Sequence, residues 1–318
     1  MIHLEHLGRT FKERLRHRSV QAVHDLTLDI APGELFGLVG PDGAGKTTTL
    51  RMLAGILKPT EGRAEVAGHD VAQDPEAIKS ILGYMPQQFG LYGDLTVDEN
   101  MAFMCDVFDV TGEEREARIR DLLAFTGLGA FRARRGRALS GGMQKKLSLA
   151  ACLIHRPRLL LLDEPTTGVD PVARREFWDV LTTLHADGST VIVSTPYMDE
   201  AERCNRVGLM YDGHLMICDT PAAIKRMLPG DVFALQAPDL NHAADVLNAM
   251  PGVSDVQSYG DRLSVIMERG SDIERLRRDL AHEGIEAIDL RPVPPRLEET
   301  FIYFVRRYAA EPQQAAAS

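Results

Sequence analysis

The stretch Gly40-Pro41-Asp42-Gly43-Ala44-Gly45-Lys46-Thr47 decides the fold of this chain. It fits the P-loop pattern, in which a glycine and four further residues precede Gly-Lys-Thr. The apolar run Leu35-Phe36-Gly37-Leu38-Val39 comes directly before it, and a helix-like segment from Thr48 to Leu57 follows. Strand, glycine loop and helix form the context that the pattern requires, so we expect a phosphate-binding loop rather than a chance glycine-rich turn.

Each residue type in this loop has a physical role toward a phosphate. Glycine lets backbone N–H groups turn inward, and the first turn of the following helix presents its positive end at the same place. Lys46 is expected to reach the β- and γ-phosphates, and the Thr47 hydroxyl is expected to bind Mg²⁺. The predicted phosphate-binding residues are Gly40, Pro41, Asp42, Gly43, Ala44, Gly45, Lys46, Thr47 and Thr48.

Composition limits the possible partners and compartment. The chain has 318 residues, enough for a large and a small domain, and 44% of them are hydrophobic. The net charge of -10 gives no support for a nucleic-acid partner, and we expect the basic cluster Lys12, Arg14, Arg16, His17 and Arg18 to be a solvated loop. The scattered cysteines Cys105, Cys152, Cys204 and Cys218 show no metal-ligand spacing, which favours reduced thiols in a cytosolic protein.

No stretch of the sequence reads as a membrane anchor. The first residues lack the apolar core of a signal peptide. Nor does any segment reach the ~18 apolar residues of a membrane span. A role in membrane transport would therefore need a separate membrane partner.

Residues 1–222 are predicted to form one α/β domain with a mainly parallel core sheet. Strand-like runs occur at residues 26–30, 35–39, 159–162, 190–194 and 207–210. Helical patterns lie between them; in Glu113–Phe125, for example, Ile119, Leu122 and Leu123 share a face.

Residues 230–308 are predicted to form a separate small domain. The expected elements are strands at 232–236, 253–257, 262–267 and 285–290, helices at 241–250 and 272–283, and a final helix at 297–307. The order β-α-β-β-α-β is the ferredoxin-like arrangement. Residues 309–318, rich in Ala and Gln, are predicted to be a disordered tail.

Two further motifs accompany the P-loop. Four leucines, Leu159 to Leu162, deliver Asp163-Glu164 to the carboxyl end of a buried strand, where open α/β sheets bind ligands. There Asp163 could hold Mg²⁺, and Glu164 could act as general base toward an attacking water. Leu139-Ser140-Gly141-Gly142-Met143-Gln144 opens a second helix whose N-terminus could bind an anion, although a lone Ser-Gly-Gly turn is more often an ordinary helix cap.

In combination, these motifs resemble the nucleotide-binding domain of ABC-family ATPases, over residues 1–222. The resemblance implies a P-loop ATPase domain with a helical signature subdomain, and it implies ATP and Mg²⁺ as ligands. Phe11 takes the place of the aromatic residue that stacks on adenine; alternatively it is a core residue. Gln87 is placed as the glutamine that senses Mg²⁺ and the membrane partner, with Thr47 and Asp163 as the other metal-binding residues.

The same resemblance assigns the remaining residues. Glu164, Lys46 and Gln87 are the implied catalytic residues. Ser140, Gly141, Gly142 and Gln144 form the signature that closes on the γ-phosphate bound by a second ATPase subunit. Thr167-Gly168-Val169-Asp170 matches the loop that crosses the dimer interface, and Asp170 is counted among the nucleotide-binding residues.

The sequence departs from the family pattern at two positions. Val193-Ser194-Thr195 runs into Pro196, where the family has a histidine, and proline has neither a side-chain donor nor a backbone N–H. Three interpretations of this departure remain open: hydrolysis is slow; another group substitutes or Glu164 suffices alone; or this subunit pairs with one whose histidine is intact. Asp42 stands where Asn or Ser is common, and we expect its carboxylate to point into solvent.

Two regions narrow the resemblance to exporters. Phe89–Asn100 is similar to the region after the glutamine loop of bacterial export ATPases, which receives a coupling helix of the permease. Arg296–Phe301 is similar to the accessory domain of ABC-2-type drug and lipid exporters such as the daunorubicin-resistance group. This implies a peripheral ATPase subunit on the cytoplasmic face of the inner membrane, working as a homodimer or heterodimer with an ABC-2-type permease and without nucleic acid. The alternatives are an ATP-dependent dimerisation switch with little hydrolysis, motivated by Pro196, and a soluble DNA or translation factor.

Overall fold

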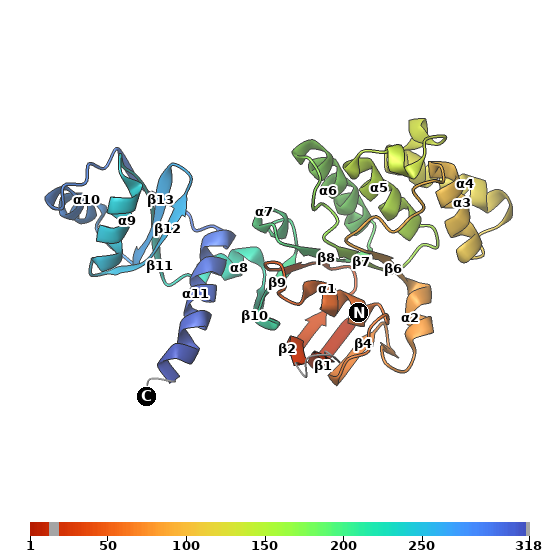
Figure 1. The fold of residues 1–318 in the computed structure, drawn as a ribbon, viewed down its shortest axis with the longest axis horizontal. Coiled ribbons are helices and arrows are strands. Elements are labelled where there is room, and N and C mark those ends of the chain that lie inside the picture. The colour runs from red at the N-terminus through yellow and green to blue at the C-terminus, as the bar shows by residue number, and fades with distance from the viewer. Residues whose placement is uncertain (13–18, 316–318) are drawn as a thin grey trace. The chain divides into compact units, whose positions relative to one another are not determined.

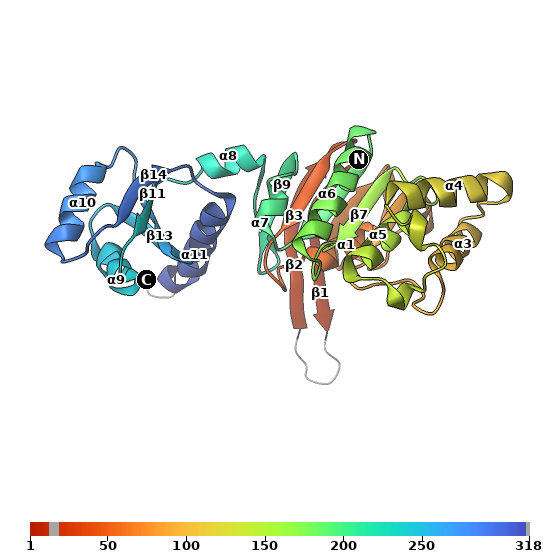
Figure 2. The ribbon, with the colours of Figure 1, turned by 90° about the horizontal axis from the view of Figure 1, so that it is seen from above.

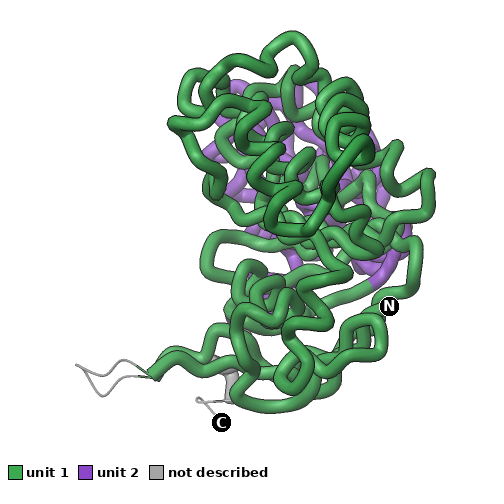
Figure 3. The backbone as a smooth tube through the Cα atoms, turned by 90° about the vertical axis from the view of Figure 1, so that its right-hand side faces the viewer, with its two compact units in different colours: residues 1–218 green, residues 219–318 purple. Residues whose placement is uncertain are grey.

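The computed structural model describes residues 1–12 and 19–315, with side chains described up to residue 309. The chain divides into two compact units, Met1–Cys218 and Asp219–Ser318 (Figure 3). Most of the predicted basic cluster lies outside the described residues; Lys12 is described. Among the described helices, none combines the length and apolar character that crossing a lipid bilayer requires.

The first unit is built on a mainly parallel sheet with the strand order β10-β9-β3-β8-β7-β6. Parallel pairing joins β3 to β8 and β9, and β7 to β6 and β8. The strands are β3 Leu35–Val39, β6 Leu82–Met85, β7 Leu159–Asp163, β8 Thr190–Thr195, β9 Arg206–Tyr211 and β10 His214–Asp219. All residues of β3, β7 and β8 are buried, which explains the apolar runs at residues 35–39, 159–162 and 191–193.

A second sheet in this unit has the order β2-β1-β4-β5, and its strand pairs are antiparallel. Its strands are β1 Ile2–Lys12, β2 Ser19–Ile30, β4 Glu61–Val66 and β5 His69–Asp70. Helix α1, Lys46–Leu53, lies between the two sheets and contacts strands of both (Figure 1). Leu50 and Met52 on α1 therefore share one core with Leu4 on β1 and Leu161 on β7.

The other helices of this unit lie around the parallel sheet, with α3 and α4 beyond its β6 edge (Figures 1 and 2). They are α2 Pro75–Ile81, α3 Val97–Val107, α4 Gly112–Phe125, α5 Gly141–Cys152, α6 Pro171–Ala186 and α7 Met198–Ala201, with 3₁₀ turns at Gly129–Phe131 and Gly136–Ala138. Helices α5 and α6 lie on the face opposite α1. Helices α3, α4 and α5 enclose an apolar cluster that includes Met101, Leu123 and Leu147, so the predicted helical subdomain has a core of its own.

The second unit has the predicted β-α-β-β-α-β order. Its elements are α8 Pro221–Arg226, β11 Gly230–Gln236, α9 Leu240–Ala249, β12 Val253–Tyr259, β13 Arg262–Glu268, α10 Ile273–His282, β14 Asp289–Val293 and α11 Leu297–Ala315. The antiparallel sheet has the order β12-β13-β11-β14, so the first and third strands of the motif are central, as the ferredoxin-like arrangement requires. A core that includes Leu235, Leu247 and Leu280 joins this sheet to α9 and α10.

Several element boundaries differ from the sequence prediction, and two of them change the description of the second unit. Gly284, with φ 76°, ends α10, and the N–H of Ile285 bonds back to the carbonyl of Leu280, so β14 begins at Asp289 instead of Ile285. Helix α11 continues to Ala315, through the Ala- and Gln-rich residues assigned to a tail; these residue types have high helix propensity. Residues 316–318 lie outside the described part.

Candidate functional site

The glycine loop runs from the end of β3 into the first turn of α1. Gly45 precedes this helix with a φ of 100°, and a Cβ there would lie 2.5 Å from the carbonyl oxygen of Ala22. Only glycine fits this position without strain. No side chain caps α1, so the N–H groups of its first turn are available to an anion.

Lys46 is buried at the start of α1, with 3% of its surface exposed. Its ammonium donates to the carbonyl oxygens of Gly40, at 2.8 Å, and Pro41, at 3.0 Å. It also lies 3.2 Å from the Oε1 of Glu164. Because these acceptors belong to the loop and to the end of β7, one cation ties the predicted phosphate loop to the predicted general base.

Glu164 follows β7 in a constrained backbone position. Its φ of 45° is rare for a residue with a side chain, and its N–H bonds to the hydroxyl of Ser194, at 2.9 Å. The carboxylate accepts from the amide of Gln87, at 2.8 Å, and from the hydroxyl of Thr167, at 3.2 Å. Such strain occurs where the surrounding structure holds a functional side chain in a fixed position.

Asp163 brings together the residues predicted to bind Mg²⁺. The hydroxyl of Thr47 donates to its Oδ1 at 2.9 Å, although the two residues are 116 positions apart in the chain. The hydroxyl of Ser194 donates to the same oxygen at 2.8 Å. A carboxylate beside a hydroxyl suits Mg²⁺, which takes oxygen ligands and usually retains water or phosphate oxygens. Gln87, the third predicted metal residue, contacts Glu164 instead.

A cavity of about 470 Å³ lies over these groups. It is lined by Ala22, Gln87, Glu164 and loop residues Asp42 to Thr48. Asp42 is exposed at its rim. The cavity is at the carboxyl ends of β3 and β7, where open α/β sheets bind their ligands.

The remaining predicted nucleotide residues lie outside this cavity. Ser140 caps α5 by accepting from the N–H of Met143, and Gly141 and Gly142 form the first turn of that helix. The side-chain amide of Gln144 donates to the carbonyl of Gly136, at 3.0 Å. Asp170 caps α6 by accepting from the N–H groups of Val172 and Ala173. Their roles toward a nucleotide stay predictions that require a second subunit.

Phe11 lies on β1, is 41% exposed and has the guanidinium of Arg9 over its ring at 4.7 Å. This excludes the alternative that Phe11 is a core residue. Phe11 does not line the cavity. Ala22 on β2 is the residue of the antiparallel sheet that does. The adenine-stacking role stays a prediction.

Pro196 follows the last residue of β8 beside the glycine loop. The carbonyl oxygen of Thr195 accepts from the N–H of Gly40, at 3.3 Å. Tyr197 is the next side chain that could supply a hydroxyl, but its ring lies under Arg174, at 4.1 Å, and does not line the cavity. The donors among the cavity-lining side chains are Lys46, Thr47, Thr48 and Gln87.

A buried carboxylate that the sequence analysis overlooked holds this strand end. Glu200 is 1% exposed and accepts from the hydroxyls of Thr166 and Thr195, both at 2.6 Å. The Nε of Arg174 lies 3.6 Å from its Oε1. Glu200 thus joins the turn after Glu164, the end of β8 and helix α6.

Glu200→Ala is expected to destabilise the first unit by about 3 kcal/mol, because it leaves two buried hydroxyls without their acceptor and removes the buried partner of Arg174. Asp199→Ala is the matched control: Asp199 also faces Arg174, at 3.7 Å, but its side chain is 73% exposed. It should cost less than about 1 kcal/mol. Urea unfolding measures both free energies, and equal values for the two variants would contradict a structural role for Glu200.

Lys145 on α5 is the second group that the sequence analysis overlooked. Its ammonium donates to the carbonyl oxygen of Gln87 and, at 3.5 Å, to that of Glu164. Burial lowers the pKa of this lysine, and the charges of Asp163 and Glu164 oppose that shift. The helical spacing of the sequence could have indicated that Lys145 is buried, because Lys145 shares the buried face of α5 with Gly142 and Leu149.

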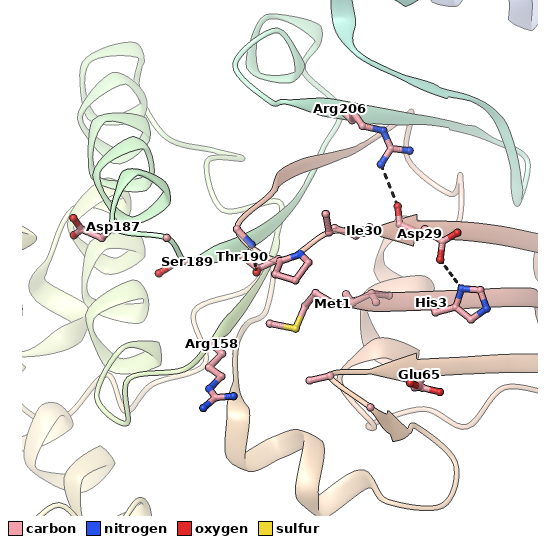
Figure 4. Close-up of a pocket in the computed structure, with 17 residues that line it drawn as sticks. Met1, His3, Asp29, Ile30, Glu65, Arg158, Asp187, Ser189, Thr190 and Arg206 are labelled. Atoms are coloured by element: carbon pink, nitrogen blue, oxygen red, sulfur yellow. Dashed lines mark hydrogen bonds and ion pairs between the residues drawn. The ribbon is translucent and has the colours of Figure 1, made fainter.

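A larger cavity, of about 950 Å³, lies at the opposite, amino ends of the parallel strands (Figure 4). In this cavity His3 bonds the Asp29 carboxylate at 2.5 Å, and Arg206 donates to the Asp29 carbonyl oxygen at 3.1 Å. Arg158 lies across the cavity from them. Among the described residues no helix N-terminus lines this cavity, and its glycines, Gly33, Gly68 and Gly188, lie in three separate turns, so it lacks the phosphate-binding features of the smaller one.

Comparisons with known proteins agree with this site. The family model described as "ABC transporter" matches residues 23–167. The chain is 43% identical over 284 residues to "Probable multidrug ABC transporter ATP-binding protein YbhF" of Escherichia coli, covering 88% of this chain and 48% of that protein. The chain thus spans about half the length of that relative. It is 34% identical to "Daunorubicin resistance ATP-binding protein DrrA3" of Streptomyces coeruleorubidus, covering 91% of this chain and 92% of the relative.

Solved structures show the same fold. "Dimeric structure of a post-hydrolysis state of the ATP-binding cassette MJ0796 bound to ADP and Pi" superposes with a TM-score of 0.64 at 28% identity. The match covers 69% of this chain and 98% of that one. The share of this chain agrees with a nucleotide-binding fold confined to the first unit.

Proposed function

This chain belongs to the ATP-binding proteins of the ABC transporter family and carries their ATPase domain, and from that premise we propose that it drives an ABC-2-type exporter by hydrolysing ATP. One observation supports the chemistry above all others. Lys46, Glu164, Gln87 and the Thr47–Asp163 pair come from distant parts of the chain and meet around one cavity.

The arrangement supports in-line attack of water on the γ-phosphorus of ATP. As a new oxygen–phosphorus bond forms, the bond from phosphorus to the β–γ bridging oxygen breaks, which yields ADP and phosphate. Glu164 takes the proton of the attacking water as general base. Lys46 supplies positive charge beside the phosphates, and the amide of Gln87, which now bonds Glu164, can orient that carboxylate.

Mg²⁺ fits the oxygen ligands of Thr47 and Asp163. When bound it would neutralise charge on the β- and γ-phosphates. The hydroxyl of Ser194 donates to the Asp163 carboxylate and holds it in position. Because Gln87 donates to Glu164, it can transmit a change in the site to neighbouring residues.

We infer that the working unit is a dimer. The signature residues at the N-terminus of α5 do not line the cavity of their own chain. A second subunit could place this helix end against the exposed side of the γ-phosphate, so ATP would join two subunits and hydrolysis would release them.

The export role is supported by the relatives' names, which include multidrug and daunorubicin-resistance ATP-binding proteins. On this proposal the chain is peripheral at the cytoplasmic face of the inner membrane, and a separate permease binds the cargo. ATP hydrolysis by the chain alone can be measured without knowing the cargo.

Steady-state ATP turnover with Mg²⁺ tests the proposal, with Pro196→His as the companion variant. We expect clear turnover by the unaltered chain and a change of less than about tenfold in Pro196→His, because Lys46 and Gln87 already supply donors around Glu164. Negligible turnover that Pro196→His raises by about 10²–10³-fold would reject the motor and favour an ATP-dependent dimerisation switch. A Thr195→Ser variant controls for disturbance of this strand end.

A further inference from the structure

Lys145 is a buried cation that the proposed chemistry does not use. It lies in the second turn of α5, the helix that begins at the signature residue Ser140, and 8% of its surface is exposed. Its ammonium has three donors, and the carbonyl oxygens of Gln87 and Glu164 accept from it. Glu164 carries the catalytic carboxylate, and Gln87 is the residue whose amide orients it.

A lysine in this environment is energetically expensive. Burial disfavours the charged form and lowers its pKa, while a methionine or leucine would fill a similar volume without that cost. The two carbonyls and the nearby charges of Asp163 and Glu164 compensate the ammonium. A group that costs stability and bonds the backbone of two active-site residues is suited to fixing their positions.

We propose that Lys145 is a positioning residue that fixes the backbone of Gln87 and Glu164 relative to the signature helix. Gln87 and Glu164 are also joined through their side chains, at 2.8 Å, so Lys145 closes a loop of contacts: α5 to Gln87, Gln87 to Glu164, and Glu164 back to α5. A displacement of the signature helix by a second subunit would therefore move the general base. This inference rests on the proposed ATPase function.

The next residue provides a matched control. Lys146 has the same charge and lies on the same helix, but it pairs with Glu176 on α6, at 2.5 Å, and does not bond Gln87 or Glu164. Replacing either lysine by methionine removes one charge and keeps an unbranched side chain that is one atom shorter. Only the Lys145 change removes contacts to the catalytic residues.

The experiment measures kcat, KM and ATP affinity for Lys145→Met, Lys145→Arg and Lys146→Met in the full chain. We expect Lys145→Met to lower kcat by about 10–100-fold with KM and affinity within about threefold, because the base is misplaced while the phosphate loop is intact. Lys145→Arg should recover most of the rate, since guanidinium also donates to carbonyl oxygens. Lys146→Met should retain the unaltered kcat. An unchanged kcat in Lys145→Met, or equal losses in both methionine variants, would overturn the inference.

A second measurement needs no turnover. Amide hydrogen exchange is followed in the peptide that contains Gln87, without nucleotide. Lys145→Met should exchange several-fold faster there than the unaltered chain, and Lys146→Met should not. If the unaltered chain has no turnover, the proposed function fails, and the exchange result alone decides whether Lys145 fixes this loop. Unchanged exchange in Lys145→Met would reject the link even in an active enzyme.

Discussion

Glu164→Gln is expected to lower the rate of ATP hydrolysis by about 10³-fold. The amide has the shape of the carboxylate but cannot take a proton from water. It can still accept from Lys46, which lies 3.2 Å from Oε1, so the phosphate loop keeps its geometry. ATP binding should therefore remain within a few-fold of that of the unaltered chain.

Three measurements separate this effect from misfolding. Steady-state phosphate release gives the rate of hydrolysis, and binding of a fluorescent ATP analogue gives the affinity. Size-exclusion chromatography with ATP detects a dimer that hydrolysis no longer dissociates. Glu113→Gln, the same change at an exposed position on α4, is the control and should have no effect. Retained turnover in Glu164→Gln would mean that another group accepts the proton.

Lys46→Ala is expected to weaken ATP binding by at least about 10²-fold. A charge-assisted bond to phosphate contributes roughly 1.5–3 kcal/mol, and this ammonium can make more than one. The buried carboxylate of Glu164 also loses its cation, so some loss of stability should accompany the loss of affinity.

Affinity and thermal stability are therefore measured together for this variant. Lys58→Ala also removes one positive charge, at an exposed position shortly after α1. It should leave both the ATP affinity and the unfolding temperature unchanged. A folded Lys46→Ala protein that binds ATP normally would exclude the glycine loop as the phosphate site. We expect a folded protein that has lost affinity for ATP and that unfolds at a lower temperature than the unaltered chain.

The sequence was most informative where a short motif determines local geometry. Gly45 with a left-handed φ, a lysine directly after it and an apolar strand before it define the loop, and the structure forms it between β3 and α1. Leu159 to Leu162 likewise predicted a fully buried strand that ends at Asp163. In the second unit, alternating patterns were sufficient to predict the order of strands and helices.

The features that the sequence did not reveal depend on contacts between distant segments. The register of β1 with β4, which pairs Leu4 with Ala64, has no short-range signal. Glu200 looks like an ordinary surface charge in sequence, because its partners are hydroxyls on other elements. Helical spacing places Lys145 on the buried face of α5, but it does not reveal the carbonyl oxygens that Lys145 bonds. Likewise, the contact of Gln87 with Glu164 instead of Asp163 depends on how β6 and β7 end side by side.

The position of β3 in its sheet also has a consequence for synthesis of the chain. Both neighbours of this strand, β8 and β9, follow it far along the sequence; nearby, the N–H of Gly33 bonds to the hydroxyl of Thr190, 157 residues later. At typical translation speeds of ~5–20 residues per second, the apolar strand leaves the ribosome on the order of ten seconds before its first partner. Until then the glycine loop lacks the parallel sheet that anchors it. A truncated or stalled nascent chain therefore exposes an unpaired apolar strand, which makes it a substrate for chaperones and proteases before it can become an ATPase.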